Sequence, residues 1–174
     1  MPHIDEPIHL SEPQDQWPQL FEQERQRLVA GLAERVDAIE HIGSTAVPGL
    51  IAKPIVDILV GMRSYPPSDT TLSVLVALGY ELLGEAGVPN RTYLRRRSDA
   101  NFNLHVVEVG SSHWRANLAL RRLLRASPSA RTRYSEAKRQ AVASGANMLL
   151  TYSDAKASVI AELLAEALRA NSDA

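Results

Sequence analysis

Residues 38–62 constrain the fold of this chain more than any other stretch, because they read as a strand, a turn of small residues and a second strand. The second strand, residues 55–60, is an apolar run interrupted by a single carboxylate, Asp57. Apolar runs of this kind are typical of strands covered on at least one face. A buried charge is unfavourable unless it is paired or binds a metal. Asp57 is therefore either the partner of a buried arginine or part of a functional site.

The turn between the two strands distinguishes two kinds of phosphate-binding site. A Walker-type loop requires G-x4-G-K-[ST]. Here five residues separate Gly43 from Gly49, Lys53 lies four positions further on, and Pro54 follows it. The spacing therefore excludes a Walker loop. It matches the nucleotidyltransferase pattern instead, in which a Gly-Ser pair follows one strand and a carboxylate lies on the next, 13 positions after Ser44 in this chain.

The chemistry of nucleotide binding explains both parts of that pattern. Backbone N–H groups and a hydroxyl in a tight turn can hold nucleotide phosphates. A carboxylate on the next strand can hold a divalent metal that neutralises charge on a phosphoryl group. We therefore expect Gly43, Ser44 and Thr45 to bind phosphate with Lys53 as a further partner, and Asp57 to hold Mg²⁺. The plain alternative is that the glycines only form a turn.

Strand alternation predicts which polar side chains lie near Asp57. Successive residues of a strand point to opposite faces. In the strand expected at residues 102–109, Asn103 and His105 share the polar face, whereas Glu108 has the opposite parity. We expect His105 to lie beside Asp57 as a metal ligand or general base, because a neutral imidazole suits either role. Glu108 is the weaker candidate for a metal ligand.

A row of basic residues occupies the strand expected at residues 92–97. Arg91, Tyr93, Arg95 and Arg97 share one face of this segment, opposite Leu94. Guanidinium groups grip phosphates and carboxylates well, so Arg91 and Arg95 are candidate ligand-binding residues. An edge strand whose charges discourage aggregation explains the same pattern equally well.

The rest of the chain predicts an α+β domain. We expect a mixed sheet of about five strands in a nucleotidyltransferase-like fold, with helices packed on one face and the other face open at the site. Residues 1–174 should form one domain, and residues 1–14 an extended lead-in. Helices are expected from Trp17, after an N-cap at Ser68 or Asp69, and at about 112–126, 128–144 and 154–170; strands are expected at 38–42, 80–83, 92–97 and 102–109.

Composition excludes several classes of function. The formal net charge of −1 argues against a nucleic-acid binder or a polybasic membrane binder. There is no cysteine, which excludes disulfides and thiolate chemistry. No apolar stretch approaches 18 residues, and the N-terminus lacks the pattern of a signal peptide. We therefore expect a cytoplasmic protein that binds a nucleotide or another phosphorylated small molecule; the oligomeric state is open.

The central stretch also resembles a known family. His41-Ile-Gly-Ser-Thr-Ala-Val-Pro-Gly-Leu50, Ala52-Lys53-Pro54 and Asp57-Ile58 are similar to the signature of the GrpB-like proteins. The resemblance continues through Trp17-Pro18, Leu104-His105-Val106 and Trp114 and covers nearly the whole chain. It implies a nucleotidyltransferase fold in a family also found fused to dephospho-CoA kinases. It also pairs Tyr152 with Lys156, and implies that Lys156 reaches toward bound phosphate.

Two positions depart from the implied pattern. Metal-dependent nucleotidyltransferases usually carry a second carboxylate two residues after the first, and this chain has Leu59 there. GrpB-like proteins often have a histidine where this chain has Asn103. The leading hypothesis is a protein that binds a nucleotide and Mg²⁺ and, if it catalyses, transfers an NMP group to a small acceptor. The alternative is a non-catalytic nucleotide- or metabolite-binding module, linked to coenzyme A metabolism.

Overall fold

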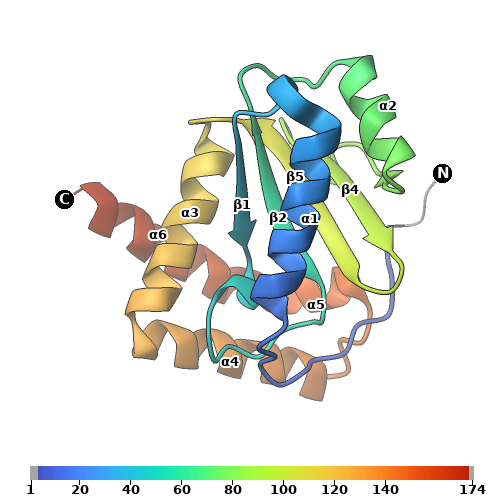
Figure 1. Ribbon diagram of the computed structural model, residues 1–174. Coiled ribbons are helices and arrows are strands. Elements are labelled where there is room, and N and C mark those ends of the chain that lie inside the picture. The colour runs from blue at the N-terminus through green and yellow to red at the C-terminus, as the bar shows by residue number, and fades with distance from the viewer. Residues whose placement is uncertain (1–3, 173–174) are drawn as a thin grey trace.

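The computed structural model describes residues 4–172 and contains a five-stranded mixed sheet (Figure 1). The strands are β1 (Ala38–Ile42), β2 (Val56–Met62), β3 (Glu81–Leu82), β4 (Thr92–Arg97) and β5 (Asn101–Glu108). Their order across the sheet is β1-β2-β5-β4-β3. Only the central pair β2–β5 is parallel, and the other neighbours are antiparallel. This confirms the expected α+β class and the strand number.

One face of the sheet is buried under two helices, α1 (Trp17–Leu32) and α2 (Asp69–Ala77). The hydroxyl of Ser68, one of the two N-caps expected from the sequence, caps α2 by accepting a hydrogen bond from the Thr71 N–H. The core on this face takes alternate residues of the central strands together with one side of α1 and α2: Leu28, Leu32, Val56, Ile58, Val60, Leu75, Leu94, Phe102, Leu104 and Val106. Alternation therefore turns Asp57 and His105 to the other face.

Four further helices follow the sheet in sequence: α3 (Ser112–Ala126), α4 (Pro128–Ala143), α5 (Leu149–Ala155) and α6 (Ala157–Ser172). Trp114 and Leu118 of α3 pack against Leu59 and Val107, which lie on the same face as Asp57. Gly61 permits this approach, since a Cβ there would lie 2.6 Å from the Trp114 ring. The site face is consequently less open than expected, because α3 covers part of it.

The loop between β1 and β2 is anchored by the C-terminal helices. Val47 and Leu50 of this loop are buried against a cluster from three helices, made by Leu124 of α3, Ala130 and Tyr134 of α4 and Leu163 of α6. The sequence pattern predicted α3 and α4 closely. It did not predict α5, and it placed the start of the last helix at about residue 154, which lies within α5.

The part of the expected lead-in that the structure describes, residues 4–14, forms no helix and is held against the domain, whereas residues 1–3 lie outside the described residues. Pro7 forms a bridge with Met148, and Ser11 forms another with Ala52. Glu6 forms an ion pair with Arg97 at 2.6 Å. This segment therefore connects the sheet with the end of the chain that carries α5. Within residues 4–172, no helix is long and apolar enough to span a bilayer.

Candidate functional site

The turn after β1 is shaped to bring its backbone against Asp57. Gly43 adopts a positive φ of 69°, and the short helix η2 (Ser44–Ala46) follows it. A Cβ at position 43 would lie 2.8 Å from Asp57 Oδ2. Glycine is therefore needed here for two reasons, since other residues disfavour this φ and have no room beside the carboxylate. The Gly-Ser turn and the carboxylate of the sequence motif are thus in direct contact.

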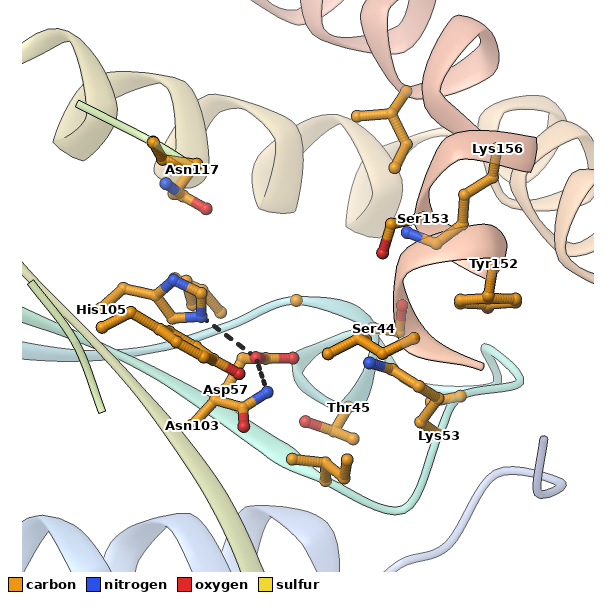
Figure 2. Close-up of a pocket in the computed structure, with 18 of the residues that line it drawn as sticks. Ser44, Thr45, Lys53, Asp57, Asn103, His105, Asn117, Tyr152, Ser153 and Lys156 are labelled. Atoms are coloured by element: carbon orange, nitrogen blue, oxygen red, sulfur yellow. Dashed lines mark hydrogen bonds and ion pairs between the residues drawn. The ribbon is translucent and has the colours of Figure 1, made fainter. Parts of the chain in front are cut away.

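Asp57 lies next to Asn103 and His105 on the site face (Figure 2). The parallel register pairs Asp57 with Asn103. Asn103 Nδ2 donates a hydrogen bond of 2.9 Å to Asp57 Oδ1, and His105 Nε2 lies 3.1 Å from the same oxygen. Glu108 is exposed at the opposite end of β5, paired in register with Met62. The predicted proximity of His105 and Asp57, without Glu108, is confirmed.

The ring of His105 is held on both sides. Arg91 Nη1 lies 3.4 Å from its Nδ1, and the Tyr93 ring packs at a centroid distance of 5.3 Å. An arginine can only donate, so Nδ1 is the acceptor in this contact. The ring proton is then on Nε2, which donates to Asp57. In this arrangement His105 orients the carboxylate.

The surroundings of Asp57 keep it ionised. Burial alone would raise its pKa, but the hydrogen bond from His105, the nearby charge of Lys53 and the hydrogen bond from Asn103 together lower the pKa below its usual value. Its Oδ1 accepts both of these hydrogen bonds, whereas no donor among the described residues contacts Oδ2. Asp57 therefore presents one carboxylate oxygen for a further interaction.

These groups line a pocket of about 450 Å³ between the sheet, the β1–β2 loop and the C-terminal helices. Tyr134, Tyr152 and Asn117 contribute to its wall. It brings together all but one of the residues that the sequence suggested for catalysis or ligand binding: Gly43, Ser44, Thr45, Lys53, Asp57, Arg91, His105 and Lys156. The sequence motif and the end of the chain thus form a single site.

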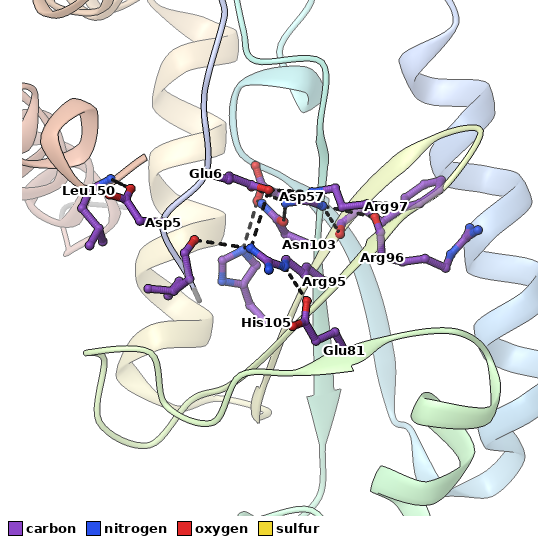
Figure 3. Close-up of polar contacts among 12 residues, drawn as sticks. Asp5, Glu6, Asp57, Glu81, Arg95, Arg96, Arg97, Asn103, His105 and Leu150 are labelled. Atoms are coloured by element: carbon purple, nitrogen blue, oxygen red, sulfur yellow. Dashed lines mark hydrogen bonds and ion pairs between the residues drawn. The ribbon is translucent and has the colours of Figure 1, made fainter. Parts of the chain in front are cut away.

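Arg95, the remaining candidate, does not line this pocket. Its Nε donates to Glu81 Oε2 at 2.7 Å, and its Nη1 lies 3.6 Å from Glu6 (Figure 3). The neighbouring Arg97 contacts Glu6 and also donates to Asn103 Oδ1 at 2.9 Å. These contacts give Arg95 and Arg97 a structural explanation: they fix the N-terminal segment to the sheet, and Arg97 orients the amide that supports Asp57.

Lys138 of α4 is a pocket residue that the sequence analysis missed. Its side chain is only 2% exposed, and its Nζ donates to the Ser44 hydroxyl and to the Ile51 carbonyl, the latter at 2.7 Å. Burial lowers its pKa well below the usual lysine value, and the charges of Lys156 and Lys53 act in the same direction. A signal was present in the sequence, because Lys138 is four residues from Tyr134 on the buried side of α4.

His41 supports the turn from below. Its Nε2 lies 2.9 Å from Thr45 Oγ1, and its ring stacks on Phe21 at a centroid distance of 4.7 Å. Burial, with smaller contributions from Arg125 and Arg121, lowers the pKa of His41 to about 4 against the effect of Asp57. The Thr45 hydroxyl therefore forms a hydrogen bond with a neutral histidine, and the backbone of Thr45 is the part available to a ligand.

The site offers few ligands to a metal. Among the described residues, no group of three or more His, Asp or Glu side chains is placed to hold an ion. Leu59, at the position of a usual second carboxylate, is fully buried under α3. Mg²⁺ is commonly held by one or two carboxylates together with water and substrate phosphates. Asp57 Oδ2 fits that mode, in which the ligand brings most of the oxygens.

Comparison with known proteins shows similarity over most of the chain. The family model described as "GrpB protein" matches residues 7–166. A UPF0157 protein of Halalkalibacterium halodurans is 34% identical over 160 residues, covering 92% of this chain and 82% of that protein. A UPF0157 protein of Streptomyces coelicolor is 38% identical over 154 residues, covering 88% of this chain and 80% of that protein.

Two further similarities concern a solved structure and an enzyme. The crystal structure of the conserved protein GrpB from Enterococcus faecalis superposes with a TM-score of 0.85 at 33% identity, covering 94% of this chain and 99% of that one. Dephospho-CoA kinase of Mycolicibacterium paratuberculosis is 32% identical over 80 residues, which are 44% of this chain and 20% of that enzyme. From its sequence and its fold alike, this chain belongs to the GrpB family.

Proposed function

We propose that this chain binds a phosphorylated small molecule in the pocket, with a nucleotide accompanied by Mg²⁺ as the first candidate. One observation carries the proposal: the glycine–serine turn, an ionised carboxylate and several cationic side chains face the same cavity. Phosphate groups suit the turn and the cations. The free oxygen of Asp57 would receive the metal ion that travels with the phosphates. The cytoplasmic location expected from the sequence is part of this proposal.

Each pocket residue then has a role in binding. The backbone of Gly43, Ser44 and Thr45 and the side chains of Lys53 and Lys156 would contact phosphate oxygens. Arg91 and His105 would orient Asp57 and close that end of the pocket. Mg²⁺ held by Asp57 would neutralise charge on the phosphoryl group. If the chain is a transferase, an NMP group would move from this position to a small acceptor.

Binding without catalysis is favoured by Leu59. A two-metal transfer reaction needs more carboxylates than Asp57 alone provides. Leu59 packs in an apolar cluster with Ile42, Val107, Trp114 and Leu118, so this position is committed to the core. A non-catalytic nucleotide- or metabolite-binding module is therefore the second candidate. The partial match to a dephospho-CoA kinase supports coenzyme A metabolism as its context.

Calorimetry tests the proposal directly. The four ribonucleoside triphosphates are titrated into the protein with Mg²⁺ and again with EDTA, and dephospho-coenzyme A is included as a ligand. We expect at least one of these ligands to bind, and Asp57→Asn to remove the effect of Mg²⁺. A transferase should lose most of its affinity in EDTA, whereas a simple binding module should bind equally well in both conditions. If the folded protein binds none of these ligands, the proposal is wrong.

A further inference from the structure

Lysine is rare in this chain, and its distribution is unusual. Of the 19 lysine and arginine residues, only Lys53, Lys138 and Lys156 are lysines. All three line the same pocket. They come from three separate segments: the loop before β2, the middle of α4 and the position that follows α5. No local sequence pattern links these segments, so the tertiary fold alone gathers every lysine of the chain at one site.

Two tyrosine rings form a shared wall for the three ammonium groups. Lys138 Nζ lies 4.2 Å from the centroid of the Tyr134 ring. Lys156 Nζ lies 5.9 Å from the same ring and 5.1 Å from that of Tyr152. Lys53 Nζ also lies 5.9 Å from the centroid of the Tyr152 ring. Cation–π contacts of this kind hold positive charge in place but leave N–H groups available to an anion.

No carboxylate among the described residues lies within ion-pair distance of this cluster, and Asp57 acts on it only from further away. Among the side chains that the structure describes, none of the three lysines forms an ion pair with Asp or Glu. Arg97 and Arg121, which lie outside the pocket lining, differ in this respect, since Arg97 pairs with Glu6 and Arg121 with Glu40. Gathering like charges in a partly buried place is unfavourable unless a counter-charge is supplied. The pocket therefore has room for an anion of considerable charge.

The three lysines are concentrated at one end of the pocket. Figure 2 shows Lys53 and Lys156 with Tyr152 on the side of Ser44 that faces away from His105. Lys138 contacts the Ser44 hydroxyl itself. A single phosphate group carries about −1.5 to −2 charge at neutral pH, which is less than three ammonium groups can balance. Two or three consecutive phosphates carry enough charge to do so.

We propose that Lys53, Lys138 and Lys156 form a polyphosphate subsite, which selects ligands with two or more consecutive phosphates over ligands with one. This inference rests on the proposed function in that the phosphates belong to the ligand of the same pocket. The phosphate chain lies beside the two tyrosines, and one end of it reaches the Mg²⁺ that Asp57 would hold. The ligand class is therefore a nucleoside di- or triphosphate or a similar diphosphate ester.

Proton uptake accompanies binding in this arrangement. Burial lowers the pKa of Lys138 and of Lys53, and the charge of Lys156 lowers both further, whereas Asp57 acts in the opposite direction. A polyanion beside them raises these pKa values again, because it stabilises the charged form. Ligand binding and the protonation of these two lysines are therefore coupled. The geometry of the cluster and this proton linkage make separate, measurable predictions.

The first experiment uses inorganic anions, so it does not depend on any nucleoside contact. Phosphate, pyrophosphate and tripolyphosphate are titrated calorimetrically in EDTA, in two buffers with different ionisation enthalpies. We expect tripolyphosphate to bind at least tenfold more tightly than phosphate, with net proton uptake. Equal affinity for the three anions would refute the polyphosphate subsite.

Variants connect the effect to the lysines. Lys156→Gln alters a half-buried position and should fold normally, whereas Lys138→Met removes a buried charge while keeping the length of the side chain. Each should weaken tripolyphosphate at least tenfold but phosphate much less. Arg139→Gln is the matched control, because Arg139 is the next residue of α4 and is exposed. Lys156→Gln binding tripolyphosphate as tightly as the control would overturn the assignment.

The scarcity of lysine also gives a direct spectroscopic readout. Protein labelled with ¹³C at the lysine ε-carbon should give three signals only, and their titration reports each ammonium group. Tripolyphosphate should raise the pKa of Lys53 and Lys138, and unchanged titration curves of these two groups at saturation would refute the subsite. If tripolyphosphate binds and nucleotides do not, the subsite stands and the nucleotide proposal falls. If AMP binds as tightly as ATP, the nucleotide proposal stands and the subsite falls.

Discussion

Lowering the pH should destabilise this protein through one buried histidine. His41 is 7% exposed, stacked on Phe21 and hydrogen-bonded to Thr45, and its pKa is lowered to about 4 from an ordinary value of 6.5. Between these two pKa values the unfolded chain binds a proton at this position and the folded chain does not. Stability is therefore complete above about pH 6.5 and falls as the pH decreases toward 4.

The size of the effect follows from the two pKa values. At pH 5 the unfolded state gains about 2 kcal/mol from protonating His41, whereas at pH 7.5 it gains almost nothing. The difference is about 3 kcal/mol at pH 4 and slightly larger below it. This is a large part of the stability of a typical domain, which is about 5–15 kcal/mol.

Urea unfolding at pH 7.5 and pH 5 measures this contribution. The variant His41→Gln keeps an N–H group that can donate to Thr45 but does not titrate. We expect it to be less stable than the parent at pH 7.5, because it loses the stack on Phe21. Its loss of stability between the two pH values should be about 2 kcal/mol smaller than that of the parent. Equal pH dependence in the two proteins would refute the assignment of the effect to His41.

Three further predictions concern the site and the core. Asp57→Asn and His105→Ala should each weaken Mg²⁺-dependent ligand binding, with a coupling energy of about 1 kcal/mol between them in a calorimetric double-mutant cycle. Glu108→Gln should change the affinity by no more than a few tenths of a kcal/mol, and a larger effect would contradict the assignment of Glu108 to the opposite face of the sheet. Gly43→Ala should lower the free energy of unfolding by about 2 kcal/mol or more, because alanine disfavours this positive φ and its Cβ would clash with Asp57. Unchanged stability in urea denaturation would contradict this geometry. Glu24→Gln should cost about 3 kcal/mol in the same assay, since a buried carboxylate with two arginine partners and a tyrosine partner is lost; unchanged stability would show that the cluster contributes nothing.

The arrangement around Asp57 could be predicted because strand alternation has a fixed period. Residues two apart in β5 share a face, so Asn103 and His105 were placed beside Asp57 without any knowledge of strand order. The same rule assigned Glu108 to the other face, and the structure confirms it. Predictions that follow from local geometry of this kind depend only on recognising the strand.

Features that depend on distant contacts were not predictable in the same way. Lys138 meets Ser44 across 94 positions of sequence, and its helix gives no indication of which loop it faces. The lead-in places Glu6 against Arg97, which converts part of an expected ligand-binding row into structural ion pairs. The helix α5 has seven residues and begins at Leu149. The N-cap residue before it, Met148, provides no side-chain cap, so the usual sequence signal for a helix start is missing.

The bridge between the two ends of the chain has a consequence for synthesis. All five strands precede residue 109, so a nascent chain can complete the sheet while its C-terminal helices are still being made. The pocket needs α4 and α5, and the hydrogen bond from the Leu150 N–H to Asp5, 145 positions earlier, adds α5 to the contacts that hold the N-terminal segment. A chain stalled before these helices would expose the apolar side chains of the β1–β2 loop together with an unshielded Asp57. A ligand present during translation should therefore bind only after the last helices have been synthesised. It should then stabilise their packing against a sheet that has already formed.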